Sequence, residues 1–180
     1  AAKPIFAAVC DELRRRCPDR NALGRAWEAL CVRYLIDERQ MEWVGRPADM
    51  DEEARAAIGL GCARDVGIDL VARRGTQWVA VQCKFRSRGS VTWRELATFD
   101  ALCGRSGPWH GCWVMTNTNA SRRAGAPLPT DTCVGEQTWK TLDRAAWNRM
   151  AGCGEGCTLG GATCLDAREG RTEWLDRIEG

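Results

Sequence analysis

The stretch DVGIDLVARRGTQWVAVQCK, residues 65–84, decides the fold that we expect for this chain. Two runs rich in Val, Ile and Trp flank a short polar segment at Gly75. This composition predicts two antiparallel strands, over 68–72 and 77–85, joined by a tight turn. Side chains two residues apart in a strand point to the same face. Alternate residues of the second strand are therefore expected to face the core.

Lys84 is the unusual residue of this stretch. Three of the 26 basic residues are lysines (Lys3, Lys84 and Lys140), and Lys84 stands within an apolar strand. Lys is a compact point charge that fits beside one water or oxygen, whereas Arg is a broad fork. Gln82 shares the face of Lys84, and Asp69 is expected near Gln82 if the hairpin pairs about its turn. A carboxylate, an amide oxygen and an ammonium then meet at one edge of the sheet.

Oxygen groups of this kind suit a hard cation such as Mg²⁺. The main-chain carbonyl of Cys83 is expected to join the side-chain oxygens of Asp69 and Gln82. A Lys beside a metal-bound water orients that water and stabilises charge that develops on a phosphate. The pattern therefore indicates phosphate chemistry with Mg²⁺, for which Mn²⁺ is expected to substitute.

The rest of the chain alternates helical and strand patterns. A Thr92–Glu95 capping box predicts a helix start, and the run GCWVMT predicts a buried strand. A hairpin followed by a crossover helix to a further strand predicts an α/β fold with a mixed sheet and helices on both sides. We expect helices over 5–16, 22–37, 92–103 and 142–150, strands over 41–44, 111–116 and 132–134, and a helix or turn over 117–123.

The composition predicts one folded domain over 1–150, followed over 151–180 by a Gly-rich linker and a candidate terminal helix. No apolar run reaches the roughly 20 residues that span a bilayer. The N-terminus lacks the pattern of a signal peptide. Eleven cysteines scattered through the predicted helices and strands favour reduced thiols in an intracellular setting. Zinc at Cys153, Cys157 and Cys164 stays open, because a structural site needs four ligands.

Three segments together resemble the PD-(D/E)xK nuclease superfamily, in its Mrr-like restriction endonuclease branch. That branch typically reads G-x-x-F-E on a first helix, then D-x-G-x-D, then Q-x-K. The corresponding segments here are GRAWE at 24–28, DVGID at 65–69 and QCK at 82–84, with Trp27 in place of the usual Phe. The resemblance covers about residues 20–150. Within that branch, the chain is especially similar to the nuclease domain that precedes helicase modules in some restriction and viral proteins.

The resemblance implies a restriction-endonuclease-like mixed sheet that cleaves DNA with Mg²⁺, leaving a 5′-phosphate and a 3′-hydroxyl. Asp69 would be the principal metal ligand, and Gln82 a neutral ligand in place of the commoner Glu. Lys84 would position or activate the attacking water. Glu28 would complete the site from the helix, directly or through a metal-bound water. The partners implied are DNA and a covalently linked or associated helicase or ATPase module.

Alternatives to this interpretation stay open. The fold can serve as a DNA-binding or protein-interaction module without catalysis, or as a structure-specific junction nuclease. Glu12, Glu38 and Glu53 are rivals to Glu28. Trp93 is a candidate for stacking on a nucleic acid, whereas Asp65 is expected to stabilise the entry to its strand. The chain has no initiator Met, so we expect a processed protein or part of a longer one. We expect it in the cytoplasm, or in the nucleus if its source is eukaryotic or viral.

Overall fold

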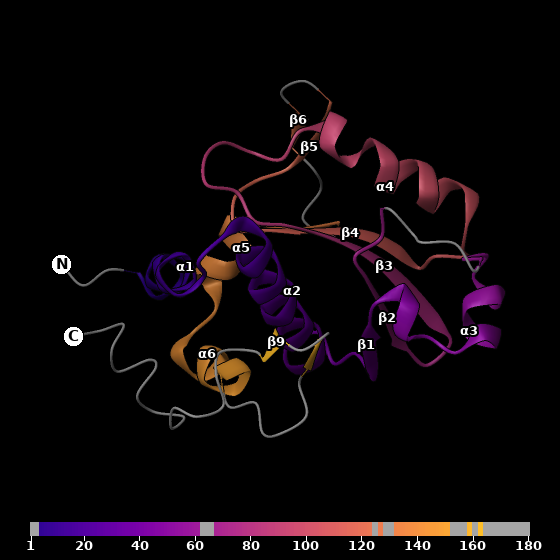
Figure 1. Ribbon diagram of the computed structural model, residues 1–180, viewed down its shortest axis with the longest axis horizontal. Coiled ribbons are helices and arrows are strands. Elements are labelled where there is room, and N and C mark those ends of the chain that lie inside the picture. The colour runs from indigo at the N-terminus through magenta and orange to yellow at the C-terminus, as the bar shows by residue number, and fades with distance from the viewer. Residues whose placement is uncertain are drawn as a thin grey trace.

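A five-stranded mixed sheet forms the centre of the molecule (Figure 1). The computed structural model describes residues 4–61, 67–123, 126–127, 132–151, 158–159 and 162–163. The strand order is β1-β2-β3-β4-β7. Strands β1, β2 and β3 are antiparallel neighbours, whereas β4 runs parallel to β3 and β7 parallel to β4. The strands are β1 (Trp43–Gly45), β2 (Leu70–Arg74), β3 (Gln77–Lys84), β4 (Gly111–Thr116) and β7 (Cys133–Val134).

The β2–β3 hairpin has the register that the sequence predicts. Arg74 pairs with Gln77 across a two-residue turn, and the ladder continues to Leu70 opposite Val81. Gly75 has a φ of 58°, a left-handed conformation that glycine adopts without a steric penalty. Because the turn fixes the register, it also fixes which side chains lie opposite each other at the far end of the hairpin.

Helices cover both faces of the sheet, so the predicted α/β architecture is confirmed (Figure 1). One face packs against α1, α2, α5 and α6 through a core that includes Trp27, Trp139 and Trp147. The other packs against α4 and the segment around α3 through Ile58, Leu96 and neighbouring apolar residues. The helices are α1 (Ile5–Arg16), α2 (Arg20–Asp37), α3 (Glu52–Ala57), α4 (Trp93–Arg105), α5 (Glu136–Thr141) and α6 (Arg144–Ala151), with a 3₁₀ turn at Pro47–Asp49.

Side-chain caps place the starts of the two helices that flank the hairpin. The carboxylate of Asp19 accepts a hydrogen bond from the Ala22 N–H at 2.8 Å, which begins α2. Glu95 accepts from the Thr92 N–H at 2.9 Å, and a capping box begins α4 as predicted. Each cap satisfies an N–H that has no partner inside its helix.

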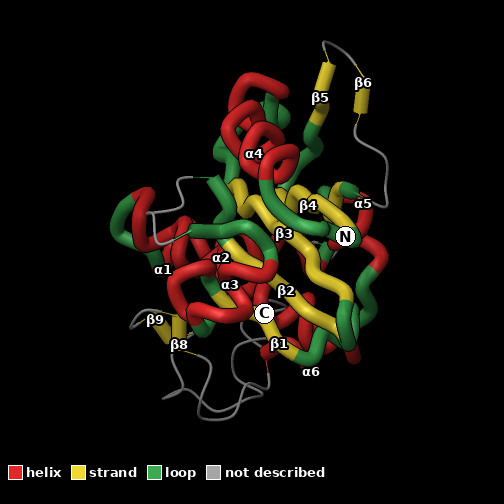
Figure 2. Tube along the Cα trace, turned by 90° about the vertical axis from the view of Figure 1, so that its right-hand side faces the viewer, coloured by secondary structure: helices red, strands yellow, loops and turns green. Residues whose placement is uncertain are grey.

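Residues 117–123 differ in part from the expectation of a helix or turn. A turn follows Asn117, and then β5 (Ser121–Arg123) pairs with β6 (Ala126–Pro127). The extended conformation is supported by the preceding loop, because Ser121 donates to the Val91 carbonyl at 3.0 Å. Figure 2 shows this hairpin projecting beside α4. The short helix α5 was also not expected.

The Gly-rich segment contains a small hairpin, β8 (Thr158–Leu159) with β9 (Ala162–Thr163), which lies against α2. The three cysteines proposed for zinc, the candidate terminal helix over 165–178, and Asp65 lie outside the described residues. In the part of the chain that the structure describes, no helix is long and apolar enough to cross a membrane.

Two buried tryptophans hold β4 against the helical layer. The Trp27 indole N–H on α2 donates to the Met115 carbonyl at 3.2 Å, and that of Trp139 on α5 donates to the Thr116 carbonyl at 2.9 Å. Both side chains are at most 1% exposed. A phenyl ring has no such donor. The Trp at 27 therefore gives α2 a fixed position on β4, and with it the position of the next residue, Glu28.

We predict that Trp27→Phe lowers the free energy of unfolding by about 1–3 kcal/mol, because it leaves a buried carbonyl without this donor. Urea unfolding followed by circular dichroism measures the change. Trp93→Phe, at an exposed position, is the matched control and should change stability by less than about 0.5 kcal/mol. Equal stability of the Trp27 variant and the wild type would contradict a role for this hydrogen bond.

Candidate active site

Asp69 lies directly before β2, where the β2–β3 ladder ends. Its main-chain N–H donates to the Val81 carbonyl at 3.0 Å, which carries the ladder one residue further. Its Oδ2 atom accepts hydrogen bonds from the Gln82 side-chain amide and from the Cys83 main-chain N–H, the latter at 2.7 Å. The structure thus brings together the acid and the amide that the hairpin register places opposite each other.

These hydrogen bonds leave two oxygens for a ligand. In the described part of the chain, Asp69 Oδ1 and Gln82 Oε1 have no hydrogen-bond partner. The Cys83 N–H faces Asp69, and in an extended strand the carbonyl of the same residue lies on the same side. Its thiol is buried in the core cluster between the sheet and α2, where burial raises the pKa of the thiol well above its usual range. Cys83 therefore offers its main-chain oxygen rather than its sulfur.

Lys84 is half-buried at the end of β3, with Thr116 of β4 as its neighbour in register. Among the described residues it has no carboxylate within ion-pair distance. The pKa values of Glu28 and Asp69 are raised overall, but the positive charge of Lys84 opposes this rise at both acids. The ammonium therefore lies within electrostatic reach of both. It is a cation held beside two carboxylates without being bound to either.

Glu28 reaches the site from α2. Its half-buried carboxylate has no hydrogen-bond partner among the described residues. Burial raises its pKa first and repulsion from Asp69 second, while Arg46, Arg25 and Lys84 oppose both effects. The pKa of Asp69 is also raised, chiefly by burial, against the Cys83 N–H, Lys84 and Gln82. Burial makes both acids costly to ionise, and the charge of Asp69 adds to the cost for Glu28, so a cation placed between them would lower it.

Two of the three rival acids are held in ion pairs, and the third is exposed. Glu12 pairs with Arg15 and Arg16, which lower its pKa to about 2. Glu38 pairs with Arg149 at 2.8 Å. Glu53 is exposed in the first turn of α3. Of the four acids considered from the sequence, Glu28 is the one for which the structure gives an electrostatic interaction with Asp69.

The donor set fits a hard divalent cation. It comprises two carboxylates, one amide oxygen and one main-chain carbonyl, which are the ligand types that Mg²⁺ and Mn²⁺ accept. Among the described residues no three His, Cys, Asp or Glu side chains gather as a metal site.

Asn117 was missed by the sequence interpretation. Its Oδ1 accepts from the Arg86 N–H at 2.6 Å, and its amide donates to the Arg86 carbonyl at 2.9 Å. Asn117 is 5% exposed and directly follows β4, whereas Arg86 lies two residues after Lys84. The amide therefore holds together the two loops that leave the sheet at this edge. Its position directly after a buried strand was the available signal.

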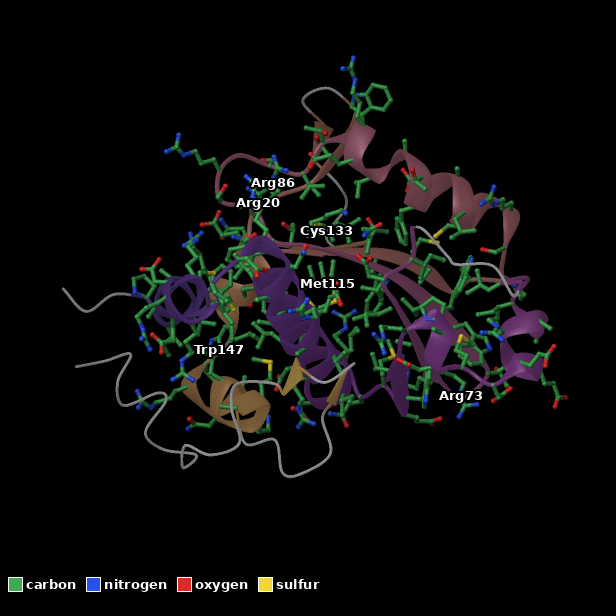
Figure 3. The ribbon with its side chains drawn as sticks, viewed as in Figure 1. Arg20, Arg73, Arg86, Met115, Cys133 and Trp147 are labelled. Carbon is green, nitrogen blue, oxygen red and sulfur yellow. The ribbon has the colours of Figure 1, made fainter. Side chains whose placement is uncertain are left out.

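Arg25 and Arg46 act electrostatically on Glu28, whereas other arginines are engaged elsewhere. The Arg86 guanidinium pairs with Glu95 at 2.6 Å and so joins its loop to the start of α4. In Figure 3, Arg86 lies near Arg20 and well away from Arg73. Trp93, near the Arg86 loop, is 46% exposed, with the Arg94 guanidinium 5.5 Å from its ring centroid. Contact of this tryptophan with DNA stays a prediction.

Comparison with known proteins supports the resemblance found in the sequence. A family model described as a restriction endonuclease, of the Mrr type, matches residues 38–150, which is more than half of the chain. The matched region contains Asp69, Gln82 and Lys84 and begins after Glu28. No curated protein and no solved structure matches the chain.

We predict that Asn117→Ala accelerates hydrogen exchange at the Arg86 amide by about tenfold or more, because that N–H loses its acceptor. Asn117→Asp is the matched control. It keeps an acceptor for the Arg86 N–H and should retain most of the protection. Protection in the Ala variant equal to that of the wild type would show that Asn117 does not hold this loop.

Proposed function

The chain belongs to this restriction endonuclease family, and from that premise we propose that it is a Mg²⁺-dependent endonuclease that hydrolyses the phosphodiester bonds of DNA. The observation that carries the proposal is Lys84. It is a half-buried ammonium without an ion pair in the described part of the chain, and it stands beside two partly buried acids. A lysine with a structural role would be expected to pair with one of them.

The cation would be held by Asp69, Gln82, Glu28 and the main-chain carbonyl of Cys83. When bound, it supplies Lewis-acid stabilisation of negative charge on the phosphate. The chain orients these groups before substrate arrives, because the Cys83 N–H and the Gln82 amide fix the Asp69 carboxylate. Mn²⁺, which takes similar oxygen ligands, should substitute.

Lys84 acts on the attacking water. Its ammonium donates a hydrogen bond that orients the water oxygen toward the phosphorus, in line with the bond to the leaving 3′ oxygen. The same charge stabilises the oxyanion that develops on the phosphate. Attack forms a new P–O bond to the water oxygen as the bond to the 3′ oxygen breaks. The attacking water loses a proton to bulk water, and the leaving 3′ oxygen takes up a proton from bulk water, so the products are a 5′-phosphate and a 3′-hydroxyl.

Delivery of DNA by an ATP-driven module is the finer part of the proposal. It is supported by the resemblance to helicase-linked nuclease domains and by a net charge of only +2, which gives weak non-specific affinity for phosphates. Alone, the chain should then cut slowly, with little sequence preference and a steep dependence on salt. Rapid cleavage of one defined sequence by the chain alone at physiological salt would contradict this dependence.

We predict that Lys84→Ala, Lys84→Arg and Asp69→Ala each reduce metal-dependent nicking of supercoiled plasmid by about 10²-fold or more. The Arg variant should fail because its wide fork replaces a point donor. Lys140→Ala removes a lysine that pairs with Glu136 on the surface, and this control should cut at the wild-type rate.

Circular dichroism establishes that each variant is folded. Wild-type cleavage by a folded Lys84→Ala variant would exclude the assignment. A wild-type chain that binds DNA but cuts with neither metal would indicate a binding module.

We predict that Gln82→Glu binds Mn²⁺ more tightly, because a third carboxylate adds attraction to the cation. Isothermal titration calorimetry of the isolated protein measures this without any need for cleavage. Gln77→Glu makes the same exchange at the exposed start of β3 and should leave the affinity unchanged. Equal or weaker affinity in the Gln82 variant would mean that Gln82 is not a ligand.

A further inference from the structure

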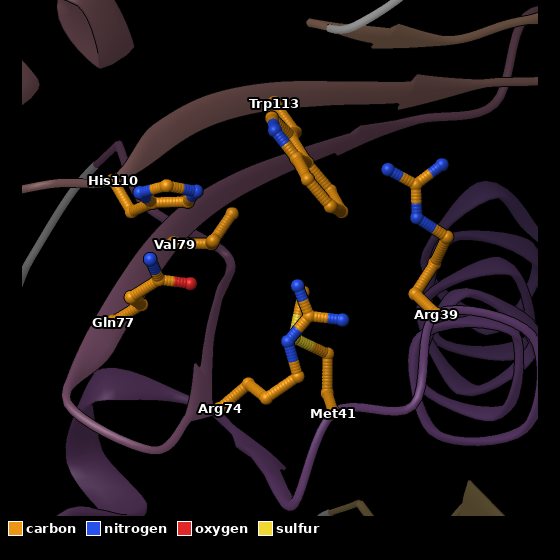
Figure 4. A pocket seen from close by; sticks show the side chains of 7 residues that line it. All are labelled: Arg39, Met41, Arg74, Gln77, Val79, His110 and Trp113. Carbon is orange, nitrogen blue, oxygen red and sulfur yellow. The ribbon is translucent and has the colours of Figure 1, made fainter.

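A polar cavity lies toward the opposite end of β3 from Lys84. It has a volume of about 150 Å³ and opens on the sheet face that packs against α2 (Figure 4). The nearest residues of the two sites on β3, Val79 and Gln82, are three apart, about 10 Å along the strand, and their side chains point to opposite faces of the sheet. The cavity is therefore a separate site. Its lining residues are Arg39, Met41, Arg74, Gln77, Val79, His110 and Trp113.

The cavity is positively charged and has no acid in its lining. Neither Arg39 nor Arg74 has an ion-pair partner in the part of the chain that the structure describes. The carboxylate of Glu42 instead accepts a hydrogen bond from the Gly75 N–H at 3.0 Å. In Figure 4 both guanidinium groups extend toward the space beside the Trp113 ring. Two uncompensated guanidinium groups directed into one small cavity favour an anion.

The fold holds Arg39 in place before any ligand binds. Its guanidinium lies 4.5 Å from the centroid of the Trp113 ring. The chain turns sharply after it, because Gln40 takes a left-handed φ of 56° and its side-chain amide donates to the Asp37 carbonyl at 2.7 Å. Met41 then donates to the Leu35 carbonyl at 3.0 Å. A group ordered in this way loses little further freedom on binding, which favours affinity.

We propose that this cavity binds a phosphate monoester of the nucleoside monophosphate class, with its phosphate between Arg39 and Arg74. The planar fork of Arg matches phosphate oxygens in pairs. Two guanidinium groups balance the nearly double charge of a monoester, whereas a carboxylate carries a single charge. Met41, Val79 and Trp113 offer apolar contacts to the attached group. Because drug-sized ligands occupy roughly 300–1,000 Å³, the cavity takes the phosphate and part of this group.

The phosphate has two sources, a free nucleotide or the 5′-phosphate end of a nucleic acid, and the experiment separates them. Isothermal titration is performed in EDTA with AMP, inorganic phosphate, and a short duplex with or without a 5′-phosphate. We expect AMP to bind one site, and Arg39→Ala and Arg74→Gln each to weaken it by about tenfold or more. Arg73→Gln, on the adjacent residue whose guanidinium faces the Trp78 ring, should change the affinity by less than about twofold.

If the arginine variants weaken binding of the phosphorylated duplex but not of AMP, the same phosphate site is assigned to the 5′-phosphate end of a nucleic acid. Binding of all probes that is insensitive to both arginines would overturn the proposal. So would AMP binding that is lost in Lys84→Ala and kept in the arginine variants, because it would place the phosphate in the candidate active site. Arg74 is exposed, so its variant should fold, and its nicking of plasmid should be unchanged if the chain is a nuclease.

Discussion

The contact between the Asp69 carboxylate and the end of β3 is the interaction on which the candidate site depends. The β2 ladder stops at Asp69, whose main-chain N–H bonds Val81 while its side chain accepts from the Cys83 N–H and the Gln82 amide. The carboxylate thus replaces a strand residue as the partner of β3. This satisfies a main-chain N–H and leaves one oxygen of Asp69 and one of Gln82 without a hydrogen-bond partner among the described residues. The same contact would serve both the fold and the proposed chemistry.

The remaining groups are brought to this edge by contacts distant in sequence. Trp27 bonds the main chain of β4 and so fixes α2, which places Glu28 opposite Asp69. Asn117 ties the loop after β4 to the loop after β3, two residues from Lys84. Buried polar contacts of this kind are costly to break one partner at a time. The edge is therefore rigid where a cation and a phosphate would have to be positioned.

The sequence predicted the parts of the structure that follow from local patterns. Alternation and the turn at Gly75 determine the hairpin register, which makes Asp69 and Gln82 neighbours, and the Thr92 capping box determines the start of α4. The hydrogen bonds between Asn117 and Arg86 were not predictable because they join two irregular loops, and the extended conformation of β5 depends on partners outside its own sequence, Val91 and β6. The cavity of Arg39, Arg74 and His110 likewise exists only through the strand order, since no local pattern joins three residues so far apart. The roles of the metal-binding residues and of Lys84 stay predictions.

Metal-dependent cleavage of DNA by the wild-type chain tests the central claim most directly. Purified protein is incubated with supercoiled plasmid in Mg²⁺, in Mn²⁺ and in excess EDTA, and the ends of the products are examined. The account predicts nicked and linear DNA with either metal, 5′-phosphate and 3′-hydroxyl ends, and no cleavage in EDTA. Intact plasmid in both metals, or cleavage that persists in EDTA, would contradict it.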